Sequence, residues 1–211
     1  MADDGIAGTN GSTAAPSTVR ELDIPEALEL ARLAAVFEDL QYVLKCCEHL
    51  VTALGSPDTG PVRVQADDAF VEALWTGALV GYVRCFSGRA AVLADSDLKE
   101  LQLDGDVTDF HNMVKKLRDH YASRHTNPRE SFTIGAAQNN DGRPNGIAVV
   151  STPRPIVDDT TVRLLGRVAY GLSGLVDARM QETQNRVLGA AANLSPAELA
   201  KLRVVHLSTQ G

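Results

Sequence analysis

The sequence predicts a mainly α-helical bundle that carries one small β-hairpin. Three observations predict this fold class. Long stretches repeat their apolar residues at alternating spacings of three and four, which is the period of a helix. Ala, Leu and Val dominate while aromatic residues make up only 5% of the chain, a bias that favours helix packing over a β-sandwich. Two short strand-like runs surround a turn rich in Gly and Asn, a pattern typical of a hairpin.

Composition places the chain among ordinary globular proteins. It has 211 residues, of which 44% are hydrophobic and 22% charged, with a formal net charge of -7. No apolar run approaches the roughly 18 to 20 residues of a membrane span. Asp3 and Asp4 stand where a signal peptide would carry cations. We therefore predict a cytoplasmic protein that has no membrane contact, and the acidic total argues against strong nonspecific binding to nucleic acid.

The three cysteines predict neither a disulfide nor a metal site. Cys46 and Cys47 are adjacent and Cys85 is distant in sequence, which predicts reduced and mostly buried thiols. Neither Cys-x-x-Cys nor paired His spacing occurs. We predict no metal and no cofactor.

A flexible tail and a long first helix open the chain. Residues 1–18 are small and polar, which predicts disorder, and a single helical-bundle domain is expected over 19–211. Pro25 suits the first turn of a helix near 26–54, which ends before Gly55. Its seam consists of Leu30, Leu33, Phe37, Leu40, Leu44, Cys47, Val51 and Leu54. Because this seam is longer than a small domain usually needs, we predict a homodimer.

Two further helices follow. The second is predicted over about 66–86, with Gly77 and Gly81 on one face, where they let another helix approach closely. The third is predicted over about 107–125. Its narrow apolar stripe, which must face the core, consists of Phe110, Val114, Leu117 and Tyr121.

The C-terminal half is predicted to contain a hairpin at about 131–152 and C-terminal helices at about 159–203. A pair of strands is marginal in water, so we expect the hairpin to lean on the helices. The apolar period from Asp159 to Ala192 predicts a second long helix, on the order of 45 Å. A capping box at Ser195-Pro196-Ala197-Glu198 starts a short terminal helix.

The segment 111–129 gathers the groups that could bind phosphate and move protons. It has five permanent cations against one anion, and it contains three of the five histidines. His111, Arg118 and His125 are spaced by seven, so they should lie along one line at the border of the apolar stripe. Asp119 should point to the opposite, wetter side. Candidate functional residues are therefore concentrated on the third helix.

This part of the chain resembles HEPN-like helical proteins. The resemblance rests on the order of Tyr82-Val83-Arg84-Cys85-Phe86-Ser87-Gly88, a short acidic connector, Phe110-His111 and Leu117-Arg118-Asp119, followed by His125. The family motif is an Arg, a polar residue and a His with four to six intervening positions, and here six lie between Arg118 and His125. The resemblance covers roughly residues 26–190. It implies a HEPN-like bundle that pairs two motifs across a symmetric dimer.

The resemblance also implies metal-independent RNA cleavage, as in toxin or defence proteins, with RNA as substrate and an antitoxin or another protein as partner. His125 would transfer protons, Arg118 would clamp phosphate and Asp119 would orient one of them. Substrate would also contact the remaining polar groups of the segment, His111, Lys115, His120 and Arg124.

A different class of function fits the same residues. Asp119 stands where cleaving members often have Asn, and its negative charge would repel phosphate. The alternative is a non-catalytic helical interaction or scaffold protein that oligomerises through its long helices. Other enzyme types are disfavoured because the chain shows no Ser-His-Asp arrangement, phosphate loop or dinucleotide fingerprint.

Overall fold

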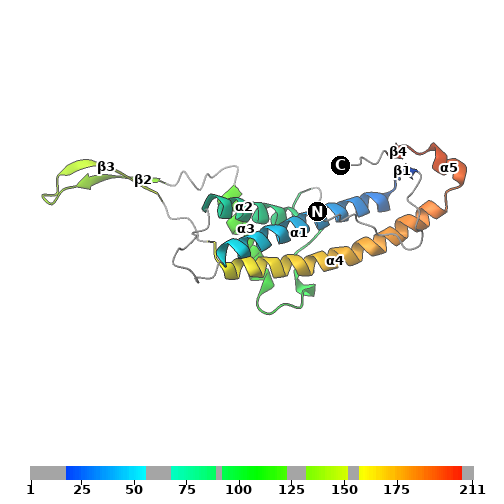
Figure 1. The fold of residues 1–211 in the computed structure, drawn as a ribbon, viewed down its shortest axis with the longest axis horizontal. Coiled ribbons are helices and arrows are strands. Elements are labelled where there is room, and N and C mark those ends of the chain that lie inside the picture. The colour runs from blue at the N-terminus through cyan, green and yellow to red at the C-terminus, as the bar shows by residue number, and fades with distance from the viewer. Residues whose placement is uncertain (1–17, 56–67, 89–91, 123–131, 152–156, 206–211) are drawn as a thin grey trace.

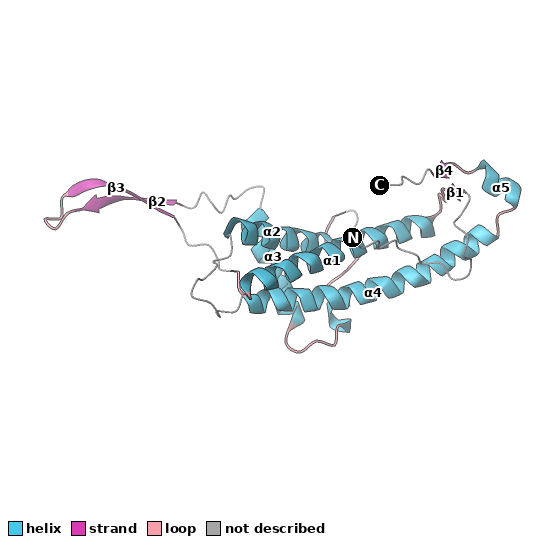
Figure 2. Ribbon diagram, viewed as in Figure 1, coloured by secondary structure: helices cyan, strands magenta, loops and turns pink. Residues whose placement is uncertain are grey.

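A computed structural model describes residues 18–55, 68–88, 92–122, 132–151 and 157–205. Their helices are α1 (Pro25–Leu54), α2 (Asp68–Arg84), the short 3-10 helix η1 (Asp97–Glu100), α3 (Val107–Ala122), α4 (Asp159–Ala192) and α5 (Pro196–Lys201). The strands are β1 (Val19–Arg20), β2 (Phe132–Gln138), β3 (Pro144–Ser151) and β4 (Val204–Val205). This confirms the mainly α-helical fold with a small hairpin (Figure 2). The predicted tail falls in residues 1–17, outside the described residues.

The two long helices α1 and α4 lie side by side, α2 packs on α1, and α3 packs on α2 (Figure 1). The buried residues of α1 are Leu33, Val36, Leu40, Val43, Cys46, Cys47 and Leu50. This stripe is rotated slightly from the predicted seam, so that Phe37 and Leu44 are only partly buried. The seam faces α4 and α2 of the same chain. A homodimer, which we inferred from the seam's length, therefore needs another surface.

Glycines allow α1 and α2 to approach closely. A Cβ atom at Gly77 would lie 2.6 Å from the hydroxyl oxygen of Tyr42, and one at Gly81 would lie 3.1 Å from Cγ2 of Val43. The predicted role of this pair in close helix packing is confirmed. Arg84 of α2 donates to Asp39 of α1, with Nε 2.6 Å from Oδ2, and so joins the same two helices.

The hairpin stands away from the bundle. β2 and β3 pair antiparallel with Ile134 opposite Val149 and Ala136 opposite Ile147, and they project beyond the N-terminal end of α4 (Figure 1). The expectation that the hairpin leans on the helices is wrong. Its apolar side chains stay exposed instead of adding to the core.

The two ends of the described chain meet at the other end of the bundle. β1 pairs antiparallel with β4, a contact that local sequence patterns do not predict. The predicted capping box is present at α5, where the backbone N–H of Ser195 donates to Glu198 at 2.8 Å and the Ser195 hydroxyl accepts from the Glu198 N–H at 3.3 Å. Among the described helices, none combines the length and apolar character that a membrane span requires.

Candidate functional site

The third helix is positioned by its apolar stripe, as the sequence predicts. Phe110 and Val114 are buried, and Leu117 and Tyr121 pack against the core while partly exposed. At the start of α3, Asp106 accepts from the N–H of Asp109 at 2.9 Å, which satisfies one of the free donors of the first turn. The polar residues of the predicted site are thereby divided between the flank of this stripe and the open face of α3.

His111 lies inside the bundle. Its side chain is 0% exposed, and its Nδ1 is 2.9 Å from the hydroxyl oxygen of Tyr82, itself fully buried. The ring also packs on Phe86, with centroids 4.5 Å apart. We expected His111 at the border of a groove, where it would bind substrate. In the observed position no ligand in solvent can reach it, because α2 and the connection before α3 cover this flank of the helix.

Burial also sets the charge of His111. Burial lowers the pKa of the imidazole below its usual value, and the positive charge of Lys115 acts in the same direction. Asp95 works against both, because the negative charge of its carboxylate, with Oδ1 3.4 Å from Nε2, favours the protonated ring. The neutral ring is therefore favoured. With the proton on Nε2 toward Asp95, Nδ1 accepts a hydrogen bond from Tyr82.

Arg118 and Asp119 contact each other. Nη1 of Arg118 lies 3.1 Å from Oδ1 of Asp119, and their side chains are 34% and 66% exposed. We expected Asp119 to point away from the line of His111 and Arg118, but its carboxylate reaches the guanidinium. The Nε of Arg118 is buried and has no hydrogen-bond acceptor. The Nε is therefore out of reach of a ligand in solvent, and Nη1 already contacts an anion.

The remaining predicted residues are only partly brought together. Lys115 is half-buried, whereas Lys116 and His120 are exposed on α3. The ring of His120 contacts that of Tyr121 edge-on, with centroids 5.7 Å apart. Arg124 and His125 lie outside the described residues. Tyr82 and Asp95, the partners of His111, were not predicted; a tyrosine within an apolar helix signals that its hydroxyl needs a buried partner.

The described residues hold no group of three or more His, Cys, Asp or Glu side chains that could bind a metal ion. Cys46, Cys47 and Cys85 are buried and free of disulfides, as predicted. Burial raises the pKa of Cys47 and Cys85 to about 12. These thiols are therefore protonated near neutral pH and are poor nucleophiles. A shallow hollow of about 470 Å³ follows η1, and residues 98–108 line it without any predicted site residue.

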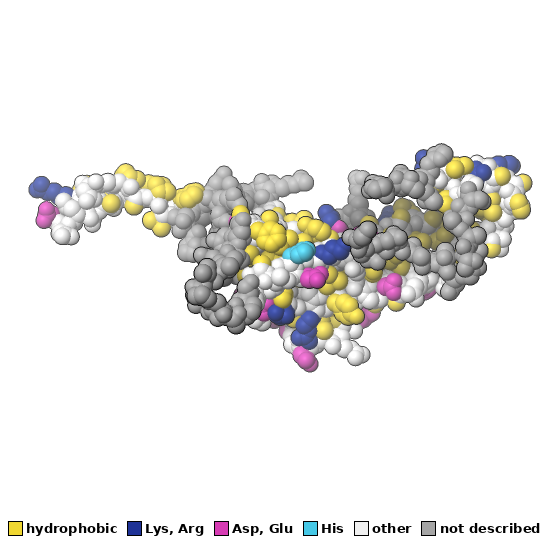
Figure 3. Space-filling model, viewed as in Figure 1, with side chains coloured by type: hydrophobic (Ala, Val, Ile, Leu, Met, Phe, Trp, Pro, Cys, Tyr) yellow, Lys and Arg dark blue, Asp and Glu magenta, His cyan; other side chains and the backbone are white. Residues whose placement is uncertain are grey.

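The hairpin presents the most apolar exposed surface among the described elements. Opposite residues of an antiparallel pair share a face, so the register places Phe132, Ile134, Ile147 and Val149 on one face. These side chains are 53%, 62%, 72% and 62% exposed. We call this set the apolar hairpin face. Apolar side chains run along the projecting hairpin in Figure 3. The other face carries Thr133 and Val150, and its remaining residues are Gly or Ala.

Comparisons of the chain with protein-family models, with curated proteins and with solved structures find no match. The function must therefore be inferred from the residues and their geometry.

Proposed function

We propose that the protein is a non-catalytic helical interaction protein that associates with a second copy of itself. The apolar hairpin face is the observation that carries this proposal. Two strands alone are marginal in water, and four large apolar side chains on one uncovered face are unfavourable there. Docking against another molecule removes both problems, because it covers the face and stabilises the strand pair.

The geometry of those predicted site residues that the structure describes supports the same choice. A cleavage site of the predicted kind needs a proton-transfer group and an available cation at one phosphate. His111, which was predicted to bind substrate, is enclosed by Tyr82 and Phe86, and Arg118, the predicted phosphate clamp, contacts the carboxylate of Asp119. An anion beside the guanidinium disfavours phosphate at that position. Both features suit a structural role more than a phosphate site.

The proposal is tested by the oligomeric state of a matched set of hairpin variants. Ile134→Thr combined with Val149→Thr changes a cross-strand pair on the apolar hairpin face but keeps residues that favour strands. Val150→Thr is the control, because it makes the same kind of change on the other face. Sedimentation velocity should show a dimer for the natural protein and for the control, and weaker association for the double variant. A natural protein that stays monomeric at its highest soluble concentration contradicts the proposal.

We keep metal-independent RNA cleavage as a second candidate, because one observation favours an anion at α3. The side chain of Arg118 is 34% exposed, and two other groups, Lys116 and His120, are exposed on the same helix. The substrate's 2′-hydroxyl would be the nucleophile, and its attack would leave a 2′,3′-cyclic phosphate and a free 5′-hydroxyl. Incubation with RNA in EDTA, beside Arg118→Ala and His125→Ala variants, tests this candidate directly.

A further inference from the structure

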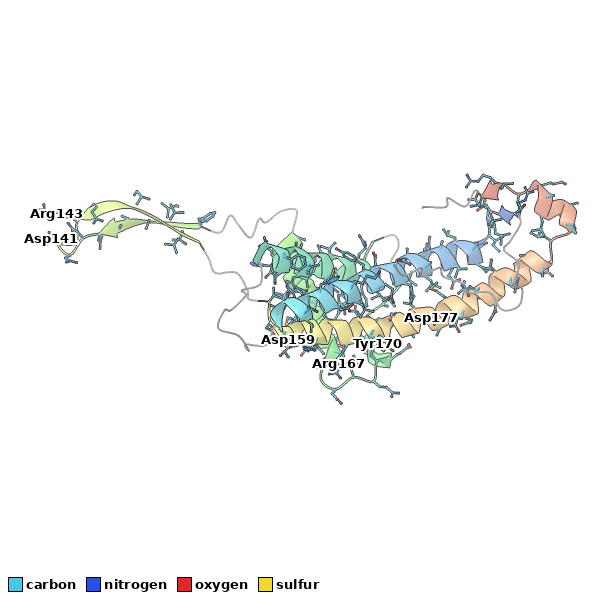
Figure 4. The ribbon with its side chains drawn as sticks, in the orientation of Figure 1. Asp141, Arg143, Asp159, Arg167, Tyr170 and Asp177 are labelled. Atoms are coloured by element: carbon cyan, nitrogen blue, oxygen red, sulfur yellow. The ribbon has the colours of Figure 1, made fainter. Side chains whose placement is uncertain are left out.

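The outward side of α4 carries two residues, Tyr170 and Gly174, that no contact among the described residues explains. Arg163, Arg167, Tyr170, Gly174, Asp177 and Gln181 are exposed along it, on the side opposite the buried Leu165, Leu172 and Val176. We call these six residues the α4 outer face. Figure 4 labels three of them, Arg167, Tyr170 and Asp177, along α4. Tyr170 is 73% exposed, which leaves most of a large aromatic ring in water.

Gly174 is the second unexplained residue of this face. A glycine inside a helix is destabilising relative to alanine, so it usually marks a close approach. Gly171 of the same helix has such a reason, because a Cβ there would lie 2.9 Å from Cδ2 of Leu101. A Cβ at Gly174 would meet nothing within 4 Å. Nothing in the described chain needs the space that Gly174 leaves.

We propose that the α4 outer face pairs with the same face of a second copy, the two helices running antiparallel about a two-fold axis level with Leu172. In such a pair, residues equally far before and after the axis face each other across the interface. Tyr170 and Gly174 are each two residues from position 172, so each tyrosine lies over the glycine of the other copy. Arg167 and Asp177 are each five residues from 172, so each arginine meets the aspartate of the other copy.

In this register the opposite charges of Arg167 and Asp177 can pair between two copies but not within one chain. Arg167 makes no ion pair with the described residues, and Asp177 accepts a hydrogen bond from Gln181 at 2.9 Å. Asp177 lies ten positions after Arg167, about 15 Å along the helix, so the two cannot pair within one chain. Farther from the axis, Arg163, which already pairs with Asp159 at 2.6 Å, lies opposite the uncharged Gln181. The register brings no like charges together.

This inference rests on the proposed self-association and names its surface. A single helix pair buries less than the roughly 1,600 Å² of a standard interface. The antiparallel register adds a second contact, because it sets residues 185–192 of one copy beside the N-terminal end of α4 in the other. The hairpin projects from that end (Figure 1), and Leu188, which is 69% exposed, is among the residues brought there. The exposed side chain of Leu188 from one copy is then available to the apolar hairpin face of the other copy.

A charge exchange tests the register. Arg167→Asp alone and Asp177→Arg alone each place like charges opposite each other at two symmetric positions, and should weaken dimerisation roughly tenfold to a hundredfold in sedimentation equilibrium. The double variant restores opposite charges between copies and should recover the natural affinity. Single variants that dimerise normally, or a double variant that stays dissociated, would overturn the α4 register while leaving self-association intact. A monomeric natural protein would overturn both.

A second pair of variants tests the glycine. Gly174→Leu should be tolerated within the chain but should hold the second helix away and weaken dimerisation. Ala35→Leu is the control, because Ala35 is exposed on α1, outside both proposed contacts, and the change likewise adds a leucine side chain at an exposed helix position. Circular dichroism verifies that both variants fold. Equal dimer affinities for the two variants would show that α4 does not pair at Gly174.

Discussion

The hydrogen bond between Tyr82 and His111 should be a measurable part of the bundle's stability. It joins α2 to α3 inside the core, with 2.9 Å between the hydroxyl oxygen and Nδ1 and with both residues fully buried. Tyr82→Phe removes the hydroxyl and leaves Nδ1 buried without a donor. Because water cannot replace the lost partner, the variant carries the desolvation cost of an unsatisfied buried group, about 1 to 3 kcal/mol. For a chain of this length, that corresponds to a fall in Tm of roughly 2 to 12 °C.

A double-mutant cycle separates this contact from the change in packing. His111→Leu keeps a similar volume but leaves the Tyr82 hydroxyl unsatisfied, so it too should destabilise the fold. With both substitutions no polar atom of the pair remains, and the loss should be smaller than the sum of the single losses by roughly 1 to 2 kcal/mol. Urea denaturation followed by circular dichroism measures all four proteins. Strictly additive losses, or a Tyr82→Phe variant as stable as the natural protein, would refute the proposed contact.

The same histidine gives stability a defined pH dependence. Burial and Lys115 lower the pKa of His111 in the folded state, so the unfolded chain takes up a proton at a higher pH than the folded one. The stabilisation that the neutral His111 ring contributes is complete above pH 6.5, the ordinary pKa of histidine, and is lost as the pH falls below that value. Denaturation at about pH 7.5 and about pH 5.5 should therefore differ more for the natural protein than for His111→Leu. An equal pH slope in both proteins would contradict a buried neutral ring.

Three further predictions concern an ion pair, an exposed glycine and the candidate RNA chemistry. Arg179→Leu should destabilise the bundle by roughly 2 to 4 kcal/mol in urea denaturation, because it removes the cation that pairs with a largely buried carboxylate. Nη2 of Arg179 lies 2.6 Å from Oδ1 of Asp97, whose side chain is only 8% exposed. An unchanged urea midpoint for this variant would contradict the prediction. Gly174→Ala should stabilise the dilute monomer by up to about 1 kcal/mol, since its Cβ meets no atom, and a destabilised monomer would disprove it. If the protein cleaves RNA, cleavage should persist in EDTA, and His125→Ala should slow it roughly 10² to 10⁴-fold. Arg118→Ala should weaken both RNA binding and turnover. A requirement for added magnesium would exclude this chemistry.

Most helices could be predicted because their apolar period is a local property. The helix expected at 26–54 is Pro25–Leu54, and the one expected at 159–192 is Asp159–Ala192. Periodicity identifies a buried face but does not identify what covers it. The long seam of α1 indicated a partner chain, yet the structure places α4 and α2 of the same chain against it. The choice between an internal and an external partner depends on distant segments that no local pattern records.

The candidate site could be predicted less well, for a related reason. His111 lies at the border of the α3 stripe, where the helical period alone allows either a groove or the core. Phe86 and Tyr82, which precede it by more than twenty residues, close this flank and enclose the ring. Contact between Asp119 and Arg118 depends on side-chain conformation, which spacing does not determine. For both His111 and the contact between Asp119 and Arg118, the sequence does not specify which neighbouring side chains surround the residue.

The hairpin connects the two proposed functions physically. Nine residues, 123–131, join the end of α3 to the start of β2, and they include Arg124 and His125. A docked hairpin fixes one end of this short connection, while Phe110 and Val114 fix the other end through α3. Association would therefore bring the predicted residues Arg124 and His125 of two copies into the same assembly. The proposed self-association would in this sense favour the RNA chemistry if that chemistry occurs, whereas an interaction protein without it would need the hairpin contact alone.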